Sequence, residues 1–122
     1  MKLKNNEIFI LANELMANMK NFEGYIPAKA NFFIQRNINT LATAAREIEE
    51  ARMGILKHYG AANEETRQFD IPVEERAAAE QELVELFNIE QDLDIKTISI
   101  DSLGDTNFTT EQMQAIMFMI EE

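Results

Sequence analysis

The stretch that most constrains the fold is residues 28–59, which contain no proline and only one glycine, Gly54. Pro27 has the fixed φ that suits the first turn of a helix, and Gly60 follows the stretch as a C-cap glycine would. The pattern predicts one uninterrupted helix, about 45 Å long at 1.5 Å per residue.

This helix carries an apolar seam whose members alternate steps of four and three residues, the spacing of a heptad. The seam comprises Ile34, Ile38, Leu41, Ala45, Ile48, Arg52, Ile55 and Tyr59. Its partner is the first helix folded back, a later helix, or the same helix of a second subunit. The charged member, Arg52, either extends its head out of an intramolecular core or fixes the register between subunits.

The N-terminal stretch predicts a helix over residues 5–20 and a turn over residues 21–26. Asn5 or Asn6 is available as the N-cap, and Gly24 interrupts the helical pattern. The apolar residues of this helix recur at spacings of three and four: Ile8, Leu11, Leu15 and Met19.

After the long helix, residues 61–70 are polar and unpatterned, which predicts a flexible loop, and residues 66–71 are a candidate short strand. Pro72 opens another helix that ends at Asn88 or Asp92. Its predicted apolar stripe comprises Ala77, Leu83, Val84, Leu86 and Phe87. Its predicted solvent face carries Glu75, Glu82 and Glu85.

Residues 95–101 change the period from helical to alternating, because Ile98 and Ile100 flank Ser99 in a β-branched stretch. We predict a short strand here. A strand needs a mate, which is either residues 66–71 or the equivalent strand of a second subunit. A turn over residues 103–107 follows.

The last predicted helix covers residues 111–120 and is opened by a capping box at residues 109–112. It is apolar nearly all round and holds three of the seven methionines, so it is buried in the core or against a partner. Methionine is adaptable enough for either task. The candidate partner interface comprises Met113, Ile116, Met117, Phe118, Met119 and Ile120.

Together these elements predict a mainly α fold in a single domain over residues 1–122. The expected architecture is an antiparallel helical hairpin with a long second helix, two further helices and a minor β element of one or two short strands.

The composition removes several classes of function. With no cysteine and one histidine, the chain lacks a thiolate nucleophile, a disulfide framework and the ligands of a usual zinc site. His58 lies near a helix C-terminus, which suits a surface role. No nucleophile elbow surrounds Ser99 or Ser102, and the glycines form no phosphate loop. We therefore expect no enzymatic activity, cofactor or small-molecule substrate.

Acidic residues in the C-terminal half offer oxygen ligands for a metal ion. They are Glu90, Asp92, Asp94, Asp101 and Asp105. Residues 101–107, however, lack the alternating ligands and closing glutamate of a calcium loop, and nothing in the sequence indicates a pocket that would tune a carboxylate pKa. We assign no metal or catalytic residue.

The net charge of −11 is unevenly distributed. Residues 1–60 carry eight Lys/Arg and six Asp/Glu, whereas residues 61–122 carry three and sixteen. The acidic half would repel a phosphate backbone, so we expect no direct binding of nucleic acid. It forms either a solvated surface or a patch for a basic partner.

Membrane insertion is not expected. The longest apolar run is far shorter than the ~20 residues that cross a bilayer, and no hydrophobic signal region follows Met1, Lys2, Leu3 and Lys4. The sequence therefore predicts a protein that stays in the cytoplasm in which it is made.

Four stretches resemble a family of small, uncharacterised phage and prophage proteins of Gram-positive bacteria. They are MKLKNNE at residues 1–7, IPAKA at 26–30 with RNI at 36–38, EEAR at 49–52 and LFNIE at 86–90. In that family the loop after the long helix is often longer and has a glycine turn suggestive of a hairpin, whereas residues 61–71 are short here. The resemblance implies a phage or prophage protein in the cytoplasm of a bacterial host, and it implies no site residues.

The leading hypothesis is a non-enzymatic phage or prophage accessory protein that acts through contacts with a protein partner or with itself, as an oligomer, with virion assembly as its setting. The first alternative is an acidic inhibitor that mimics DNA and occupies a host nucleic-acid-binding enzyme. The second is a metal-dependent enzyme whose site is built from dispersed acids.

Overall fold

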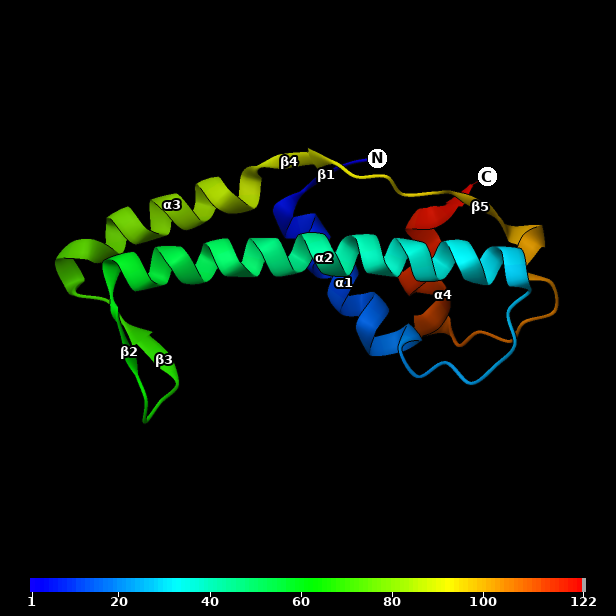
Figure 1. Ribbon diagram of the computed structural model, residues 1–122, viewed down its shortest axis with the longest axis horizontal. Helices are drawn as coiled ribbons and strands as arrows, with labels where there is room; N and C mark the ends of the chain where they lie inside the picture. Colours follow the sequence, from blue (N-terminus) through cyan, green and yellow to red (C-terminus); the bar gives the residue numbers. More distant parts are fainter. Residues whose placement is uncertain (122) are drawn as a thin grey trace.

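The long second helix is the axis of the molecule. The computed structural model describes residues 1–121, and in it helix α2 runs over Ala28–Tyr59, as the unbroken stretch predicts. Pro27 precedes it, and the backbone nitrogen of Gly60 donates to the carbonyl of Leu56 at 2.9 Å to close its last turn. Figure 1 shows the other elements arranged along α2.

The remaining elements are shorter. The other helices of the described chain are α1 (Asn5–Met19), α3 (Arg76–Asn88) and α4 (Thr110–Ile116), and single 3-10 turns occupy Val73–Glu75, Ile100–Leu103 and Met117–Met119. The strands are β1 (Lys2–Lys4), β2 (Ala61–Asn63), β3 (Gln68–Asp70), β4 (Glu90–Asp92), β5 (Ile98–Ser99) and β6 (Ile120–Glu121). The fold is mainly α with a minor β part, as predicted.

The buried stripe of α2 differs in part from the predicted seam. Its members are Ala30, Ile34, Asn37, Leu41, Ala44 and Ile48, again at steps of four and three. Ile34, Leu41 and Ile48 were predicted, whereas Ile38 and Ala45 lie on the flank and are only partly buried. The stripe is shifted because α1 covers one side of this face and an extended segment near residue 96 covers the other.

The two halves of α2 are covered by different helices. Helix α1 packs on the first half and carries α4 on itself, and α3 packs on the second half (Figure 1). After Ile48, no residue of α2 is buried, although all of its residues are described. Arg52 lies in this half, where its guanidinium bonds the carboxylate of Glu49 on the same helix at 2.6 and 2.8 Å. The two predicted roles of Arg52 stay predictions.

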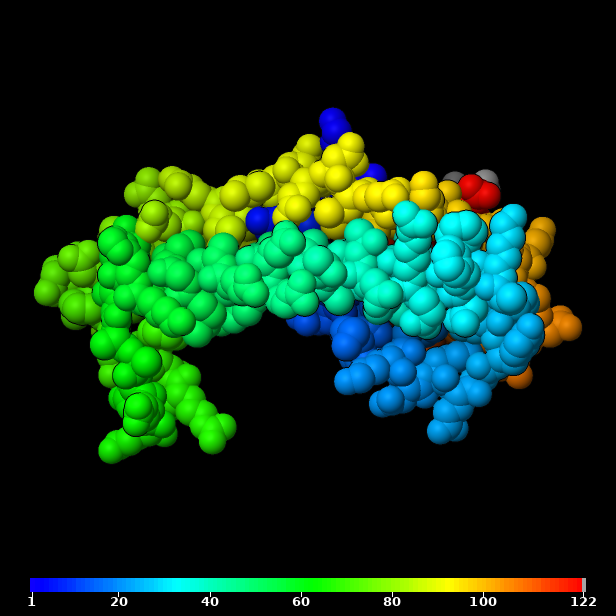
Figure 2. Space-filling view, viewed as in Figure 1, coloured from blue at the N-terminus to red at the C-terminus, as the bar shows by residue number. Residues whose placement is uncertain are grey.

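Residues 61–70 form a β-hairpin and not the predicted flexible loop. β2 and β3 pair antiparallel with Ala62 opposite Phe69, and the hairpin projects from the end of α2 (Figures 1 and 2). The candidate strand at 66–71 is confirmed as β3. Gly60 is the C-cap of α2, as predicted, although its φ of −141° is extended and not left-handed. A Cβ at this position would lie 2.7 Å from the backbone oxygen of Asp70.

The mate predicted for the strand at 95–101 is wrong. Within this region only β5, of two residues, is a strand, and it pairs in parallel with β6 of the same chain. The final α-helix ends at Ile116 and not at Ile120: a 3-10 turn over Met117–Met119 follows, and the chain is extended from Ile120, where it pairs with β5. Its predicted capping box is confirmed: Thr109 Oγ accepts from the Gln112 nitrogen at 3.1 Å.

Helix α3 ends at Asn88, the earlier of the two predicted ends, but its predicted stripe is partly wrong. Ala77 and Val84 are exposed, and Ala79 is the buried residue of this helix. Leu83 and Leu86 follow Ala79 at steps of four and three, so these three residues face α2 and Val84 lies on the opposite side. The predicted solvent face is confirmed, since Glu75, Glu82 and Glu85 are exposed.

Candidate functional site

A segment of irregular, mostly extended backbone lies beside the first half of α2 and defines the candidate site. We name residues 89–99 the strap. It contains β4 and β5 and runs antiparallel to α2 (Figure 1). The strap joins α3 to the C-terminal part of the chain. Both ends of the chain pair with it, because β1 pairs with β4 and β6 pairs with β5.

β1 fixes the first part of the strap. It pairs antiparallel with β4, and the register places Lys2 opposite Asp92 and Lys4 opposite Glu90. Opposite charges in directly facing positions stabilise such a register. The ammonium group of Met1 also donates to Asp92 Oδ1 at 3.0 Å and to the Leu93 carbonyl at 2.8 Å.

Asn5 holds the start of the strap from within the core. Its side chain is buried, donates to the Leu86 carbonyl at 2.8 Å and accepts from Gln91 Nε2 at 2.7 Å. The prediction that Asn5 or Asn6 is the N-cap of α1 is therefore wrong: Lys4 occupies that position, and its backbone nitrogen donates to Glu7 Oε1 at 3.0 Å.

Asn37 of α2 holds the second part of the strap. Its side chain is fully buried, donates to the Lys96 carbonyl at 2.8 Å and accepts from the Lys96 backbone nitrogen at 2.9 Å. Its amide nitrogen also lies 3.4 Å from the sulfur of Met119. Asn37 was not predicted as a site residue, although its spacing of three from Ile34 and four from Leu41 was a usable signal.

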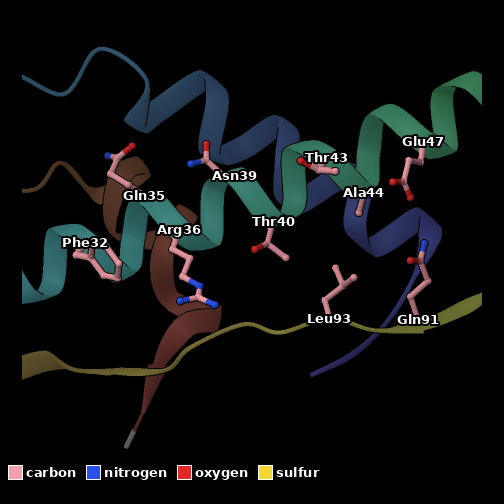
Figure 3. Close-up of a pocket in the computed structure, with 10 residues that line it drawn as sticks. All are labelled: Phe32, Gln35, Arg36, Asn39, Thr40, Thr43, Ala44, Glu47, Gln91 and Leu93. Atoms are coloured by element: carbon pink, nitrogen blue, oxygen red, sulfur yellow. The ribbon is translucent and has the colours of Figure 1, made fainter.

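Between α2 and the strap lies an open groove of about 650 Å³, shown in Figure 3. Half of the side chains in its α2 wall are uncharged hydrogen-bonding groups, and Leu93 and Gln91 of the strap point toward that wall. Phe32 stands at one end with 60% of its surface exposed. The α2 residues of the lining are Phe32, Gln35, Arg36, Asn39, Thr40, Thr43, Ala44 and Glu47.

The charges of the groove lie toward its ends. Arg36 reaches across to Asp94 at 3.4 Å, and Lys96 lies 3.2 Å from the same carboxylate. Lys96 and, to a lesser extent, Arg36 lower the pKa of Asp94 below its usual range. Glu47 stands near the other end (Figure 3). Arg36 and Glu47 are the charged members of the lining, which suits binding better than acid–base chemistry.

Most of the C-terminal residues predicted as a partner interface lie in this chain's own core or pack against it. Ile116 and Met119 are fully buried, and Met113, Phe118 and Ile120 pack against the core with partial exposure. Met117 is 52% exposed. A partner surface on this segment, which stays a prediction, would therefore depend on Met117.

The other residues considered from the sequence do not come together. In residues 1–121, no group of three or more His, Cys, Asp or Glu side chains is placed to hold a metal ion. His58 is exposed, and its ring packs edge-on against Tyr59 with centroids 4.7 Å apart. The carboxylate of Glu82 beside Tyr59 raises the pKa of that hydroxyl.

Comparison of this chain with protein-family models, with curated proteins and with solved structures found no match. Of the helices in the described part of the chain, none has the length and apolar character needed to cross a membrane.

Proposed function

We propose that this chain is a non-enzymatic phage or prophage accessory protein that acts in virion assembly by binding another protein. The observation that carries the proposed mode of action is the groove between α2 and the strap. The phage setting rests on the sequence resemblance described above, which includes MKLKNNE at residues 1–7 and LFNIE at 86–90.

The groove suits a polypeptide for three reasons. It is open along its length, which leaves room for a chain to enter from the side. Its amide and hydroxyl side chains, among them Asn39 and Thr43, offer both donors and acceptors. The exposed ring of Phe32 supplies the aromatic contact that protein interfaces favour.

The charges on the strap give less support to the alternative function, an acidic inhibitor that mimics DNA. A DNA mimic needs unneutralised carboxylates at phosphate-like spacing on one face. Asp92, however, bonds the ammonium group of Met1, and Asp94 lies between Arg36 and Lys96. These cations offset the negative charge that a DNA-binding enzyme would recognise.

The test is an affinity capture from an induced lysogen, with bound proteins identified by mass spectrometry. The tagged protein is compared with Thr43→Trp, which fills the groove from an exposed position, and with Gln81→Trp, which adds the same side chain to the exposed face of α3. We expect head, tail or connector proteins to be enriched with the unmodified protein and Gln81→Trp, and depleted with Thr43→Trp.

Two results would contradict the proposal. Recovery of a host nuclease or polymerase in place of virion proteins would favour the acidic inhibitor. Enrichment of no protein over an untagged control would remove the basis for any stable protein contact.

A further inference from the structure

We infer that the groove takes an extended peptide segment of a partner protein, with Lys or Arg at alternate positions, as a third strand on the free edge of β4. This inference rests on the proposed function, because it identifies the kind of segment through which a protein partner would bind.

One edge of β4 has no described strand paired with it. Among the described strands it pairs with β1 alone. The bonds to β1 use the carbonyl of Ile89 and the backbone nitrogen of Leu93, which flank the Leu3–Gln91 pair. Because hydrogen bonding alternates along an antiparallel strand, the backbone groups of Glu90 and Asp92 point to the other edge. Such an edge is a template for another strand.

The groove provides space for a third strand beside this edge. Gln91 and Leu93 line the groove, while β1 approaches the strap from the side of α1 (Figure 3). The lining extends from Phe32 to Glu47, or about 22 Å along α2 at 1.5 Å per residue. An extended chain at about 3.4 Å per residue fills that length with six or seven residues.

The acidic residues of β4 favour a basic strand beside it. β1 places Lys2 and Lys4 opposite Asp92 and Glu90, so one side of this acidic pair already faces lysines. A basic residue in the third strand would repeat this cross-strand pairing on the other side, most strongly at Glu90, because Asp92 already bonds the ammonium group of Met1. Side chains alternate along a strand, so the intervening residues of the peptide would face α2, and the groove between Thr43 of α2 and Leu93 of the strap has room for small or apolar groups.

The same charges argue against a second copy of this chain at the site. Pairing two β4 edges would place Glu90 and Asp92 beside the same residues of the other copy, and like charges in facing positions destabilise a sheet. The partner strand is therefore basic and belongs to a different protein.

The experiment measures the binding of a labelled, end-capped peptide of eight residues, alternating lysine and valine, to the full chain by fluorescence anisotropy. A block peptide of four lysines followed by four valines has the same charge and controls for attraction to an acidic protein. We expect the alternating peptide to bind at least tenfold more tightly than the block peptide. Thr43→Trp should remove most of that difference, and Gln81→Trp should leave it unchanged.

Backbone pairing is tested with two N-methylated forms of the alternating peptide. Methyl groups on the lysine nitrogens, which face β4 in antiparallel pairing, should weaken binding at least tenfold. Methyl groups on the valine nitrogens face away from β4 and should change it by less than threefold.

The inference is overturned if the alternating and block peptides bind equally, if Thr43→Trp has no effect, or if both methylated forms bind alike. Capture of virion proteins that is sensitive to Thr43→Trp would then preserve the proposed function with a different kind of segment in the groove. Conversely, specific binding of the alternating peptide without capture of a virion protein would support the ligand class and overturn the assembly role.

Discussion

The side-chain amide of Asn37 forms two hydrogen bonds with the backbone of Lys96, donating at 2.8 Å and accepting at 2.9 Å. The amide thus pairs with the strap as a neighbouring strand would, from a helix that has no free backbone groups in its interior. This contact holds the second wall of the groove at a fixed distance from α2. It links a core position of the longest helix to the geometry of the candidate site.

Asn37→Leu should destabilise the protein by about 1–3 kcal/mol, because it leaves the backbone nitrogen and carbonyl of Lys96 without their partner. Urea denaturation followed by circular dichroism measures the free energy of unfolding. Asn39→Leu is the matched control, since Asn39 is exposed on the same helix and should change that free energy by less than about 0.5 kcal/mol. Equal effects of the two substitutions would show that the strap does not depend on Asn37.

The sequence predicts the bounds of α2 closely because the signals at its ends are local. Pro27 and Gly60 bracket a stretch with no other break, and the 3-4 spacing within it permits only a helix. The capping box at Thr109 is likewise read from four adjacent residues. Features of this kind depend on short-range chemistry, which a single sequence contains.

The strap and the groove were not predicted because they depend on contacts between distant segments. β1 and β4 are three residues each, with the sequences KLK and EQD, and neither has the β-branched alternation that marks a strand. The partner of Asn37, the backbone of Lys96, lies 59 residues away in the sequence. Pairing across some 60 to 90 residues leaves no local pattern from which to predict it.

Replacement by alanine should change the stability of the protein in opposite directions at Gly54, within α2, and at Gly60, its C-terminal cap. Gly60→Ala places a Cβ 2.7 Å from the Asp70 carbonyl oxygen and should destabilise the β2–β3 hairpin by about 1–3 kcal/mol. Gly54→Ala meets nothing within 4 Å and should stabilise the helix by about 0.5–1 kcal/mol. Thermal unfolding of both variants measures the signs, and hydrogen exchange in residues 61–70 assigns the Gly60 effect to the hairpin. A stabilising Gly60→Ala would contradict this account of the cap.

The Glu49–Arg52 pair should add a pH-dependent contribution to stability. Hydrogen bonds from Arg52 lower the pKa of Glu49 below its ordinary value. A lowered pKa in the folded state means that the contribution is present above the unfolded pKa and is lost as the pH falls through the folded one.

Carboxyl carbon NMR titration measures the pKa of Glu49 directly. In Arg52→Met it should return toward its ordinary value, because both hydrogen bonds are lost. Lys57→Met makes the same change of charge elsewhere on α2 and should leave the pKa of Glu49 in place. An unchanged pKa in Arg52→Met would assign the shift to another group.

The methionines of the C-terminal segment allow the two predictions for this segment to be separated. Met119 is fully buried and Met117 is 52% exposed, although they are two residues apart. Met119→Ala should cost about 2–4 kcal/mol of unfolding free energy through the cavity it leaves, whereas Met117→Ala should cost less than about 0.5 kcal/mol. If this segment also mediates self-association, light scattering should show that Met117→Lys lowers the mass at high concentration without changing the unfolding midpoint. A strict monomer in the unmodified protein would exclude that second role and leave Met119 to act in the core alone.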